Sequence, residues 1–443
     1  MQYVTDLHLH SKYSRAVSPQ MNLSTMADNA RQKGLDILTA GDFTHPVWSK
    51  EIRQLLVESE EGLYQLEDNT HQGKAVRFML STEISSIYKQ GDKLRRIHSL
   101  IFVPNFETAE KFTQALVNKG CNLNADGRPI IGISVKNLYE LLLSIDERSY
   151  LIPAHVWTPH FGVYGSASGF DSLEEAFGEF AKYVYAIETG ISSDPGMNWQ
   201  IPELARRAIV SFSDAHSAPK MAREATVVEL ASLSYLTIKK AFSRLSEGGD
   251  DANKIAYTLE FYPEEGKYHF SGHRNCKVMQ GPEEIRKNGN TCPVCHRRLT
   301  EGVLYRVQEL SDETLSQRVI EKKDAKGVNW FTDKEGVQAP YVKLVPLLEI
   351  AAESLDSTVN SQKSKNLYMK LCNELVSELH VLLRASLEEI EKVGGARVAQ
   401  AVAKVRAGEI AIDPGYDGEY GKVQIWQNGE EKASNVPQLK FDL

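Results

Sequence analysis

Asp6-Leu7-His8-Leu9-His10, near the start of the chain, alternates polar, metal-ligating side chains with leucines. Alternate residues of a β-strand point to one face, so Asp6, His8 and His10 can converge on one spot. Much later in the chain, Asp214-Ala215-His216 repeats the pattern. Imidazole nitrogens mixed with carboxylate oxygens suit a divalent transition metal such as zinc, manganese or iron. The two segments together therefore predict a metal site.

The first half of the chain alternates between two kinds of pattern. Seven short apolar runs predict strands at residues 2–9, 35–40, 76–82, 97–103, 150–154, 183–187 and 208–212. Helical periodicity appears between most of them, at residues 22–33, 106–118, 134–143 and 172–180. Strands that alternate with helices predict parallel βα units, and seven in succession favour an α/β fold with a distorted (β/α)7 barrel similar to a TIM barrel.

In barrels of this kind, the loops at the carboxyl ends of the strands build the active site. Polar residues fall at those ends in this sequence: His8, His10, Asp42, Glu83, His155, Glu188, Asp214 and His216. His98 is an exception, because it lies near the start of its run. We therefore expect a polar, metal-binding site at the carboxyl end of the barrel.

Six short motifs carry a family resemblance: DLHLHSKYS, LTAGDFTHP, LSTEIS, RRIHSLIF, LIPAHVW and SFSDAHS. In this order they resemble the successive motifs of the polymerase and histidinol phosphatase (PHP) superfamily, and they cover residues 1 to about 225. The resemblance implies a distorted seven-unit βα barrel with a two- or three-metal phosphoesterase site. Two such cations can activate a water and neutralise charge on the leaving oxygen of a phosphate ester.

By position, the resemblance implies one metal surrounded by His8, His10, Glu83 and Asp214, the residues expected to be catalytic. It also implies that Glu83 bridges to a second metal, held by His98 and His155. Zinc, manganese, magnesium and iron all remain possible identities.

A third metal is left open, because the chain departs from the family in two places. Phe43 stands where many members have His, and Ser14-Arg15 stands where another ligand often lies. Asp42 and His216 are further candidate ligands, and His45 is either a substitute ligand or a loop residue.

Two ligand pairs farther along predict a structural zinc site. His273-Arg274-Asn275-Cys276 and Cys292-Pro293-Val294-Cys295 each leave two residues between their ligands. This spacing is typical of tetrahedral zinc, with thiolates at about 2.3 Å. His273, Cys276, Cys292 and Cys295 are the expected ligands, and His296 is the alternative fourth. Nearby basic and aromatic residues are either a nucleic-acid surface or an ordinary solvated one.

The whole-chain composition restricts the class of protein. With 443 residues and 42% hydrophobic residues, the chain should form two or three domains. We expect a PHP metallo-phosphoesterase domain at 1–245, a zinc-knuckle domain at 252–310 and a mostly helical, DNA-contacting region at 311–443. The net charge of −8 is unusual for a nucleic-acid binder, although metal ligands supply part of it. Five cysteines fit a reducing compartment, and no apolar run is long enough for a membrane span, so we expect a cytoplasmic protein.

The C-terminal region has helical periodicity at residues 345–353, 367–393 and 396–406. Gly394-Gly395 precedes the last of these runs. The two glycines either end a helix or let the backbone approach a phosphate, with Arg397, Lys404 and Arg406 on or near one side of the helix that follows.

The two halves together are similar to the endonuclease Q family. The resemblance rests on the PHP motifs, YHFSGHRNC, CPVC, GVLYRVQEL and ETGISSDPGMNW, and it extends to about residue 347. That family incises DNA on the 5′ side of deaminated bases and abasic sites. The resemblance therefore implies a metal-dependent repair endonuclease acting on double-stranded DNA that contains uracil, hypoxanthine, xanthine or an abasic site. Whether a sliding clamp is a partner is left open.

A repair enzyme of this kind must inspect the Watson–Crick edge of a base, which usually requires flipping it out. The segment from Glu188 to Trp199 supplies candidate groups beside the metals; alternatively, Asp194-Pro195-Gly196 is simply a turn. The expected substrate-binding residues are Glu188, Ser192, Ser193, Asn198, Trp199, Arg274 and Arg297. Two other functions remain open: a PHP-type small-molecule phosphatase, and a nucleic-acid-binding protein whose barrel is only structural.

Overall fold

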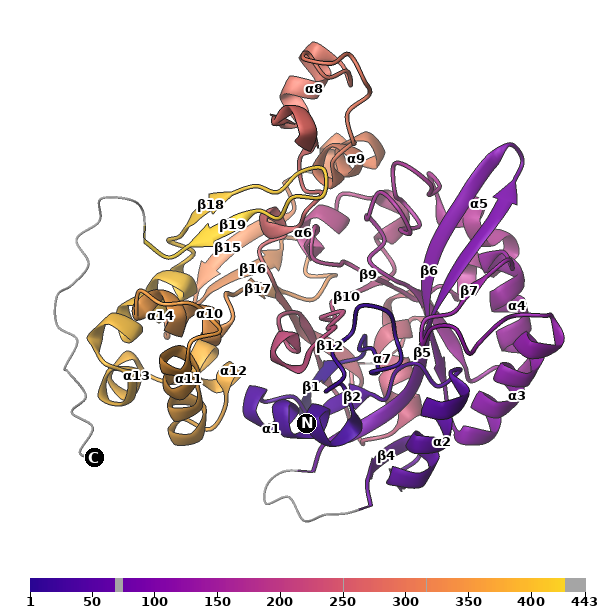
Figure 1. Ribbon diagram of the computed structural model, residues 1–443, viewed down its shortest axis with the longest axis horizontal. Coiled ribbons are helices and arrows are strands. Elements are labelled where there is room, and N and C mark those ends of the chain that lie inside the picture. Colours follow the sequence, from indigo (N-terminus) through magenta and orange to yellow (C-terminus); the bar gives the residue numbers. More distant parts are fainter. Residues whose placement is uncertain (68–74, 250, 316, 427–443) are drawn as a thin grey trace.

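The computed structural model describes residues 1–67, 75–249, 251–315 and 317–426. Its central feature is a mixed sheet of 13 strands, with helices packed around it (Figure 1). Each of the seven runs predicted as strands overlaps an observed one: β1 (Gln2–Asp6), β2 (Ile37–Thr39), β5 (Arg77–Gln90), β6 (Lys93–Val103), β8 (Tyr150–Pro153), β9 (Ala186–Glu188) and β10 (Ala208–Val210). The predicted α/β class is confirmed.

The predicted helices of the first half are also present: α1 (Leu23–Lys33), α3 (Phe106–Asn118), α4 (Val135–Ile145) and α5 (Leu173–Phe177). Asn22 caps α1, since its side chain accepts from the Thr25 N–H. Other elements here are α2 (Pro46–Leu55), β3 (Leu56–Glu60), β4 (Leu63–Leu66), β7 (Ile130–Ile131), η1 (Gly178–Tyr183), α6 (Pro195–Asn198), η2 (Pro202–Leu204), η3 (Ala218–Lys220), β11 (Ala225–Glu229) and α7 (Tyr235–Glu247).

A closed barrel of parallel strands is not confirmed. Strands β1, β2 and β5 are parallel, but β6 is antiparallel to both β5 and β8, and β1 is antiparallel to β11. Strands β9 and β10 form a separate parallel pair, so the strand ladders of the described residues do not form a ring. A hydrogen bond from Val156 N–H to the Glu188 carbonyl and a bridge between Leu9 and Ala215 connect the parts near the carboxyl ends.

Strands β5 and β6 form a long antiparallel hairpin that projects beyond the sheet (Figure 1). The sequence predicted that the first of these strands would end before Glu83, but it continues to Gln90. Because β6 runs in the opposite direction, its early residue His98 pairs with Ser85. This reversal brings His98 to the same edge as the carboxyl ends of the neighbouring strands and accounts for its exceptional position in the sequence.

The sheet continues into the second half of the chain. Strand β12 (Lys254–Glu260) pairs with β11 and with β17 (Tyr341–Lys343). β17 in turn pairs with β16 (Asn329–Asp333), which pairs with β15 (Val319–Lys323). Strands from all three expected domains therefore share one sheet, and the division at 245 and 310 stays a prediction.

The second half also contains the knuckle segment and a small hairpin, which lie close together (Figure 1). Its elements are η4 (Pro263–Glu265), β13 (Ser271–His273), η5 (Arg274–Cys276), β14 (Val278–Gln280), α8 (Pro282–Asn288), α9 (Val303–Leu310), η6 (Glu313–Leu315), β18 (Ala411–Asp413) and β19 (Lys422–Gln424). No helix among the described residues is long and apolar enough to cross a membrane.

Five helices form a bundle near the C-terminus: α10 (Leu347–Ser354), α11 (Gln362–Glu374), α12 (Glu378–Leu383), α13 (Leu387–Gly394) and α14 (Ala396–Ala407). The run predicted at 367–393 is thus three helices rather than one. A buried ion pair, Lys33 Nζ to Glu378 Oε2 at 2.7 Å, joins the bundle to α1. Glu378 also accepts from the Leu347 N–H and the Tyr368 hydroxyl, so its charge is well compensated.

Candidate active site

Three groups of potential metal ligands lie together at the carboxyl edge of the first-half strands. They are His8, His10 and Glu83; His10, Asp214 and His216; and Glu83, His98 and His155. Within each group the ligand atoms lie within 4.8 Å of one another. The structure thus brings together seven of the eight residues predicted to hold metals in the first half. His10 and Glu83 each belong to two groups.

Glu83 occupies the position between the groups. Its Oε2 lies 3.3 Å from His10 Nε2 and 3.7 Å from His8 Nε2. Its Oε1 lies 2.7 Å from His98 Nδ1 and 3.3 Å from His155 Nε2. The two carboxylate oxygens therefore face different pairs of imidazoles, which is the geometry required of a carboxylate that bridges two cations.

Asp214, which is distant from His8 and His10 in the sequence, lies close to both of them in the site. Its Oδ1 lies 3.2 Å from His10 Nε2 and 3.5 Å from His8 Nε2, and the His216 ring lies 3.6 Å away. Asp6, the last residue of β1, does not join the site. It accepts from the Ser213 N–H and hydroxyl and from the Ala222 N–H, and so fixes the segment that carries Asp214.

Two carboxylates lie behind the histidines rather than among the ligand atoms. Glu188 Oε1 lies 2.9 Å from His8 Nδ1, and Asp42 Oδ1 lies 3.3 Å from His10 Nδ1. Asp42 also accepts from Ser11 and Ser14. Carboxylates in this place orient a metal-binding imidazole and fix its tautomer. The geometry thus gives Asp42 and Glu188 a positioning role instead of the metal-binding and substrate-binding roles we expected.

The backbone is strained at three of these polar positions. Asp42, His155 and Asp214 have φ angles of 46°, 31° and 46°, a region that residues other than glycine rarely adopt. Each follows the carboxyl end of a strand. Such strain is concentrated at functional sites, where the surrounding structure holds it in place. By contrast, His45 caps α2 and stacks on Tyr13, outside the ligand groups.

The residues present fit divalent cations. His8 Nε2, His10 Nε2 and Asp214 Oδ1 are buried without a hydrogen-bond partner, although a buried polar atom normally has one. Burial lowers the pKa of His98 to about 4, so this imidazole is in the neutral form that binds metals. Burial also lowers the pKa of His8, but the attraction of Glu188, Asp214 and Glu83 outweighs it and raises that pKa well above its usual value.

Arg128 is a site residue that the sequence reasoning missed. Its Nη1 lies 3.1 Å from Glu83 Oε2. The loop that carries Arg128 packs closely against the site at Gly127. The Gly127 N–H donates to the Tyr13 carbonyl. A Cβ added at Gly127 would lie 2.5 Å from Asp42 Oδ2 and 2.3 Å from Ser14 Oγ, so a side chain would not fit there. The only local signal is a glycine before an arginine, which is common in any sequence. Arg128 can be recognised as a site residue only in the folded protein, where its loop lies against Glu83.

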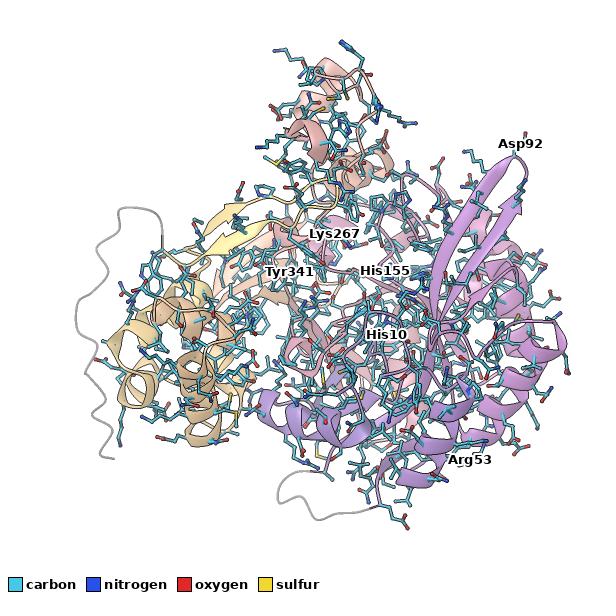
Figure 2. The ribbon with its side chains drawn as sticks, in the orientation of Figure 1. His10, Arg53, Asp92, His155, Lys267 and Tyr341 are labelled. Atoms are coloured by element: carbon cyan, nitrogen blue, oxygen red, sulfur yellow. The ribbon has the colours of Figure 1, made fainter. Side chains whose placement is uncertain are left out.

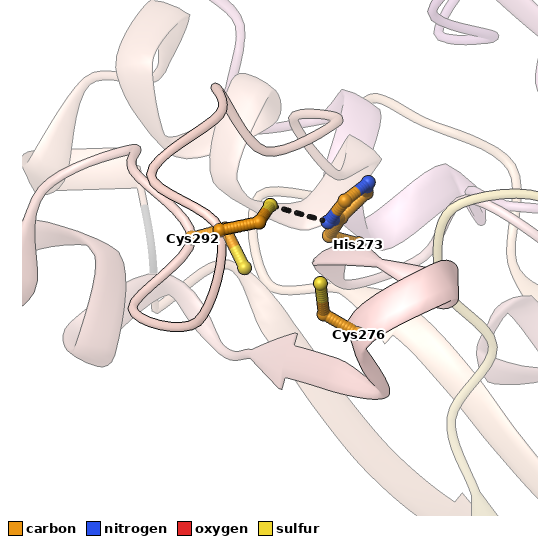
Figure 3. A group of neighbouring side chains, drawn as sticks. His273, Cys276 and Cys292 are labelled. Atoms are coloured by element: carbon orange, nitrogen blue, oxygen red, sulfur yellow. Dashed lines mark hydrogen bonds between the residues drawn. The ribbon is translucent and has the colours of Figure 1, made fainter.

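The second ligand cluster contains the four predicted residues His273, Cys276, Cys292 and Cys295. Figure 3 shows the first three turned towards one another, and Cys295 Sγ lies 3.3 Å from His273 Nδ1. Lys277 and His296, each directly after a ligand pair, have φ angles of 53° and 58°, so both pairs end in the same kind of tight turn. His296, the alternative ligand, lies outside the cluster. Burial raises the pKa of Cys292, but backbone N–H groups of Cys295 and Val294 outweigh it and lower that pKa to about 6, which favours a thiolate.

The residues expected to read the lesion are mostly internal. Trp199 is 2% exposed, and its ring makes an edge contact with Tyr341. Asn198 accepts from the Trp157 indole N–H, and the buried Ser193 hydroxyl donates to the Thr189 carbonyl. These groups hold the segment's own shape, and Trp199 does not form an open stacking wall.

The other three expected substrate-binding residues are accessible. Ser192 is half-buried, and Arg274 and Arg297 are exposed on the knuckle. Figure 2 places His10 and His155 toward the middle of the molecule, whereas Asp92 marks the outer tip of the β5–β6 hairpin.

The fold and the site define an α/β protein with a carboxylate-bridged cluster of histidines and a separate Cys/His cluster. Residues 346–409 match the family model of the MJ0043 C-terminal domain. The chain is 29% identical over 291 residues to the uncharacterized protein MJ0043 of Methanocaldococcus jannaschii, and the match covers 63% of this chain but only 33% of that protein. It is 26% identical to the uncharacterized protein YqxK of Bacillus subtilis, over 90% of this chain and 91% of that one.

Two solved structures match the whole chain at 28% identity. One is the lesion-specific endonuclease PfuEndoQ from Pyrococcus furiosus, with a TM-score of 0.79 over 99% of this chain and 98% of that chain. The other is endonuclease Q in complex with a 27-mer duplex substrate that has an abasic lesion at the active site, with a TM-score of 0.81 over 99% of each chain. The resemblance to endonuclease Q is thereby confirmed, and it extends over the whole chain rather than stopping near residue 347.

Proposed function

We propose that this protein is a metal-dependent DNA repair endonuclease. It hydrolyses the phosphodiester on the 5′ side of abasic sites and of deaminated bases, which are uracil, hypoxanthine and xanthine, and it leaves a 3′-hydroxyl. The observation that carries the proposal is Glu83, whose two oxygens face separate pairs of imidazoles in a chain that resembles endonuclease Q from end to end.

His8, His10 and Asp214 would hold one divalent cation, and His98 and His155 a second, with Glu83 between them. When bound, such a pair supplies an activated water and neutralises charge on the leaving oxygen. Glu188 and Asp42 hold the His8 and His10 rings in place from behind. The His273, Cys276, Cys292 and Cys295 cluster would hold a structural zinc, because its donors are one imidazole and three thiols at knuckle spacing.

The two alternative functions are less well supported by the chain. A small-molecule phosphatase needs neither a zinc knuckle nor a long C-terminal region. A barrel with a purely structural role would not need seven ligand residues gathered at one edge or buried ligand atoms without partners. A sliding-clamp partner stays an untested expectation.

The decisive experiment compares strand cleavage by the wild type and by Asp214→Asn. The substrates are end-labelled duplexes that contain an abasic site, uracil, hypoxanthine or xanthine, together with an undamaged duplex and a generic phosphatase substrate. We expect wild-type cleavage only at lesions and only with added divalent metal. Asp214→Asn should lower cleavage at least about a hundredfold. Even the loss of a residue that only orients a metal ligand typically lowers activity ten- to a hundredfold.

The matched control is Asp251→Asn, which removes an exposed carboxylate whose partner is Arg244. It should cleave as the wild type does. Turnover of the phosphatase substrate without lesion cleavage would favour the phosphatase. Cleavage that persists with chelator, or in Asp214→Asn, would contradict the assigned site.

A further inference from the structure

The β5–β6 hairpin carries metal-site residues and a pair of basic residues on the same face. In β5, Glu83 and Lys89 lie an even number of positions apart along the strand, and so do Arg96 and His98 in β6. Successive side chains of a strand alternate between faces, and directly paired residues of antiparallel strands share a face. The register pairs Ser85 with His98 without a shift along the hairpin. Lys89 and Arg96 therefore lie on the face that carries Glu83 and His98.

The opposite face of the hairpin is already occupied by the protein. Tyr88 is buried there, and the guanidinium of Arg95, its register partner, lies 3.9 Å from the Phe170 ring centroid. Lys93 lies on that face as well, and its charge acts on Asp171. Arg77, near the base of the same strand, is paired with Glu60, whereas Lys89 and Arg96 have no ion-pair partner among the described residues. These two cations are thus available on the face that leads away from the metal site.

We propose that Arg96 and Lys89 form a phosphate-binding track, which carries the DNA backbone outward from the cleavage site along one face of the β5–β6 hairpin. The proposal rests on the proposed function, because its ligand is the duplex that the metal site would cut. Two exposed or half-exposed cations on a rigid ribbon suit phosphates, which are contacted without regard to sequence.

The length of the ribbon indicates how far the track reaches. At about 3.3 Å per residue, the six steps along the strand from Glu83 to Lys89 span roughly 20 Å. Duplex DNA rises about 3.4 Å per base pair, so this corresponds to roughly six base pairs. Lys89 would therefore contact phosphates about half a helical turn from the cut. The ribbon itself contributes Glu83 and His98 to the site, so it also fixes the direction in which the duplex leaves.

The test uses the double variant Lys89→Gln/Arg96→Gln, the two single variants Lys89→Gln and Arg96→Gln, and the control Lys93→Gln, which like each single variant removes one positive charge, but from the opposite face of the same hairpin. Binding of a labelled abasic duplex is followed by fluorescence anisotropy in chelator at several salt concentrations, and cleavage kinetics are measured with metal. For the double variant we expect binding about tenfold weaker and a salt-dependence slope smaller by about two, one for each phosphate contact. KM should rise while kcat stays close to the wild-type value.

Two further observations distinguish a phosphate track from other effects. The loss of affinity should be equal for abasic, uracil and undamaged duplexes. Shortening the duplex to fewer than about six base pairs on the track side should weaken wild-type binding but have little further effect on the double variant. Lys93→Gln should behave as the wild type throughout.

The proposed phosphate track is contradicted if the double variant keeps the wild-type DNA affinity and salt-dependence slope. It is also contradicted if Lys93→Gln loses as much DNA affinity as the double variant. In either case, lesion cleavage by the wild type would leave the proposed function standing. Absence of both lesion binding and lesion cleavage in the wild type would instead overturn the function and the track together.

Discussion

Arg128 brings a guanidinium against the carboxylate that two ligand groups share. Its partner Glu83 is buried, and burial raises the pKa of that carboxyl, but the attraction of His98 and Arg128 outweighs it and holds the pKa well below its usual range. If cations were held by the two ligand groups that share Glu83, this guanidinium would still offer hydrogen-bond donors at the edge of the site. A planar fork of N–H donors suits a phosphate.

We predict that Arg128→Gln lowers lesion cleavage by about a hundredfold, the usual cost of removing one donor aimed at developing charge. Arg128→Lys keeps the charge but loses the fork, and should recover part of the activity. The measurement is single-turnover cleavage, with metal content determined on the same preparations. Loss of metal from Arg128→Gln would mean that Arg128 acts by holding Glu83, and unchanged cleavage would contradict both roles.

Trp199 has a different role from the one the sequence indicated. Its ring is buried against Tyr341, and Trp199→Ala should therefore destabilise the fold by about 3 to 5 kcal/mol. Denaturant unfolding measures this change. Cleavage at uracil and at abasic sites should fall together, so that their ratio stays constant. A selective loss at uracil would restore the stacking role for Trp199, and Trp199→Phe should retain most of the stability.

At the scale of elements, the knuckle is a short segment whose core is small. Only Ile285, Cys292 and Leu299 form its buried cluster. Such a segment has little hydrophobic stabilisation of its own, and a structural zinc would contribute folding free energy directly.

We predict that Cys292→Ser loses one zinc per chain, measured by elemental analysis, and binds DNA more weakly, because Arg274 and Arg297 lie on the same segment. Cys121→Ser, a change outside the cluster, is the control and should keep both properties. Equal zinc contents in the two variants would contradict the knuckle assignment.

The last two helices of the bundle bear on the two alternatives for Gly394-Gly395, which were helix termination and a close approach to a phosphate. Gly395, between α13 and α14, has a φ of 88°, so a left-handed turn requires the glycine there. Arg397 forms an ion pair with Asp356. The buried Arg406 guanidinium donates to the carbonyls of Val381, Leu382 and Ala385. Both arginines are engaged within the protein, and plain helix termination accounts for the glycines.

At the scale of the molecule, buried acids lie where the first-half strands meet β12. Glu260, at the end of β12, accepts from the hydroxyls of Ser211 and Thr258. Burial nevertheless raises its pKa to about 8. Glu224 is also fully buried, and burial together with the charge of Glu260 raises its pKa well above the usual value.

The raised pKa of Glu260 predicts a pH dependence of stability. The folded protein keeps the proton up to about pH 8, whereas the unfolded chain releases it near pH 4.3. Unfolding therefore releases a proton between these values, and the contribution of Glu260 to the free energy of unfolding falls as the pH rises. Glu260→Gln, which mimics the protonated form, should flatten the profile between about pH 5 and 8. Denaturant titrations at several pH values measure this, with the exposed Glu283→Gln as control; parallel profiles for wild type and Glu260→Gln would contradict it.

Local patterns in the sequence were sufficient to predict the α/β class, the seven strand runs of the first half, the histidines and carboxylates of one cluster of candidate metal ligands, and the four residues of the Cys/His cluster. Strand alternation, helical periodicity and ligand spacing act over a few residues, so they can be read along the chain. The antiparallel course of β6, which explains His98, depends on pairing between distant strands. Contacts between distant parts of the chain also decide four other features. They are the failure of the strands to close a barrel, the burial of Trp199, the positioning roles of Asp42 and Glu188, and the approach of Arg128 to Glu83. These features depend on contacts between residues that are far apart in the sequence. Local sequence patterns carry no information about such contacts, so only the tertiary structure determines them.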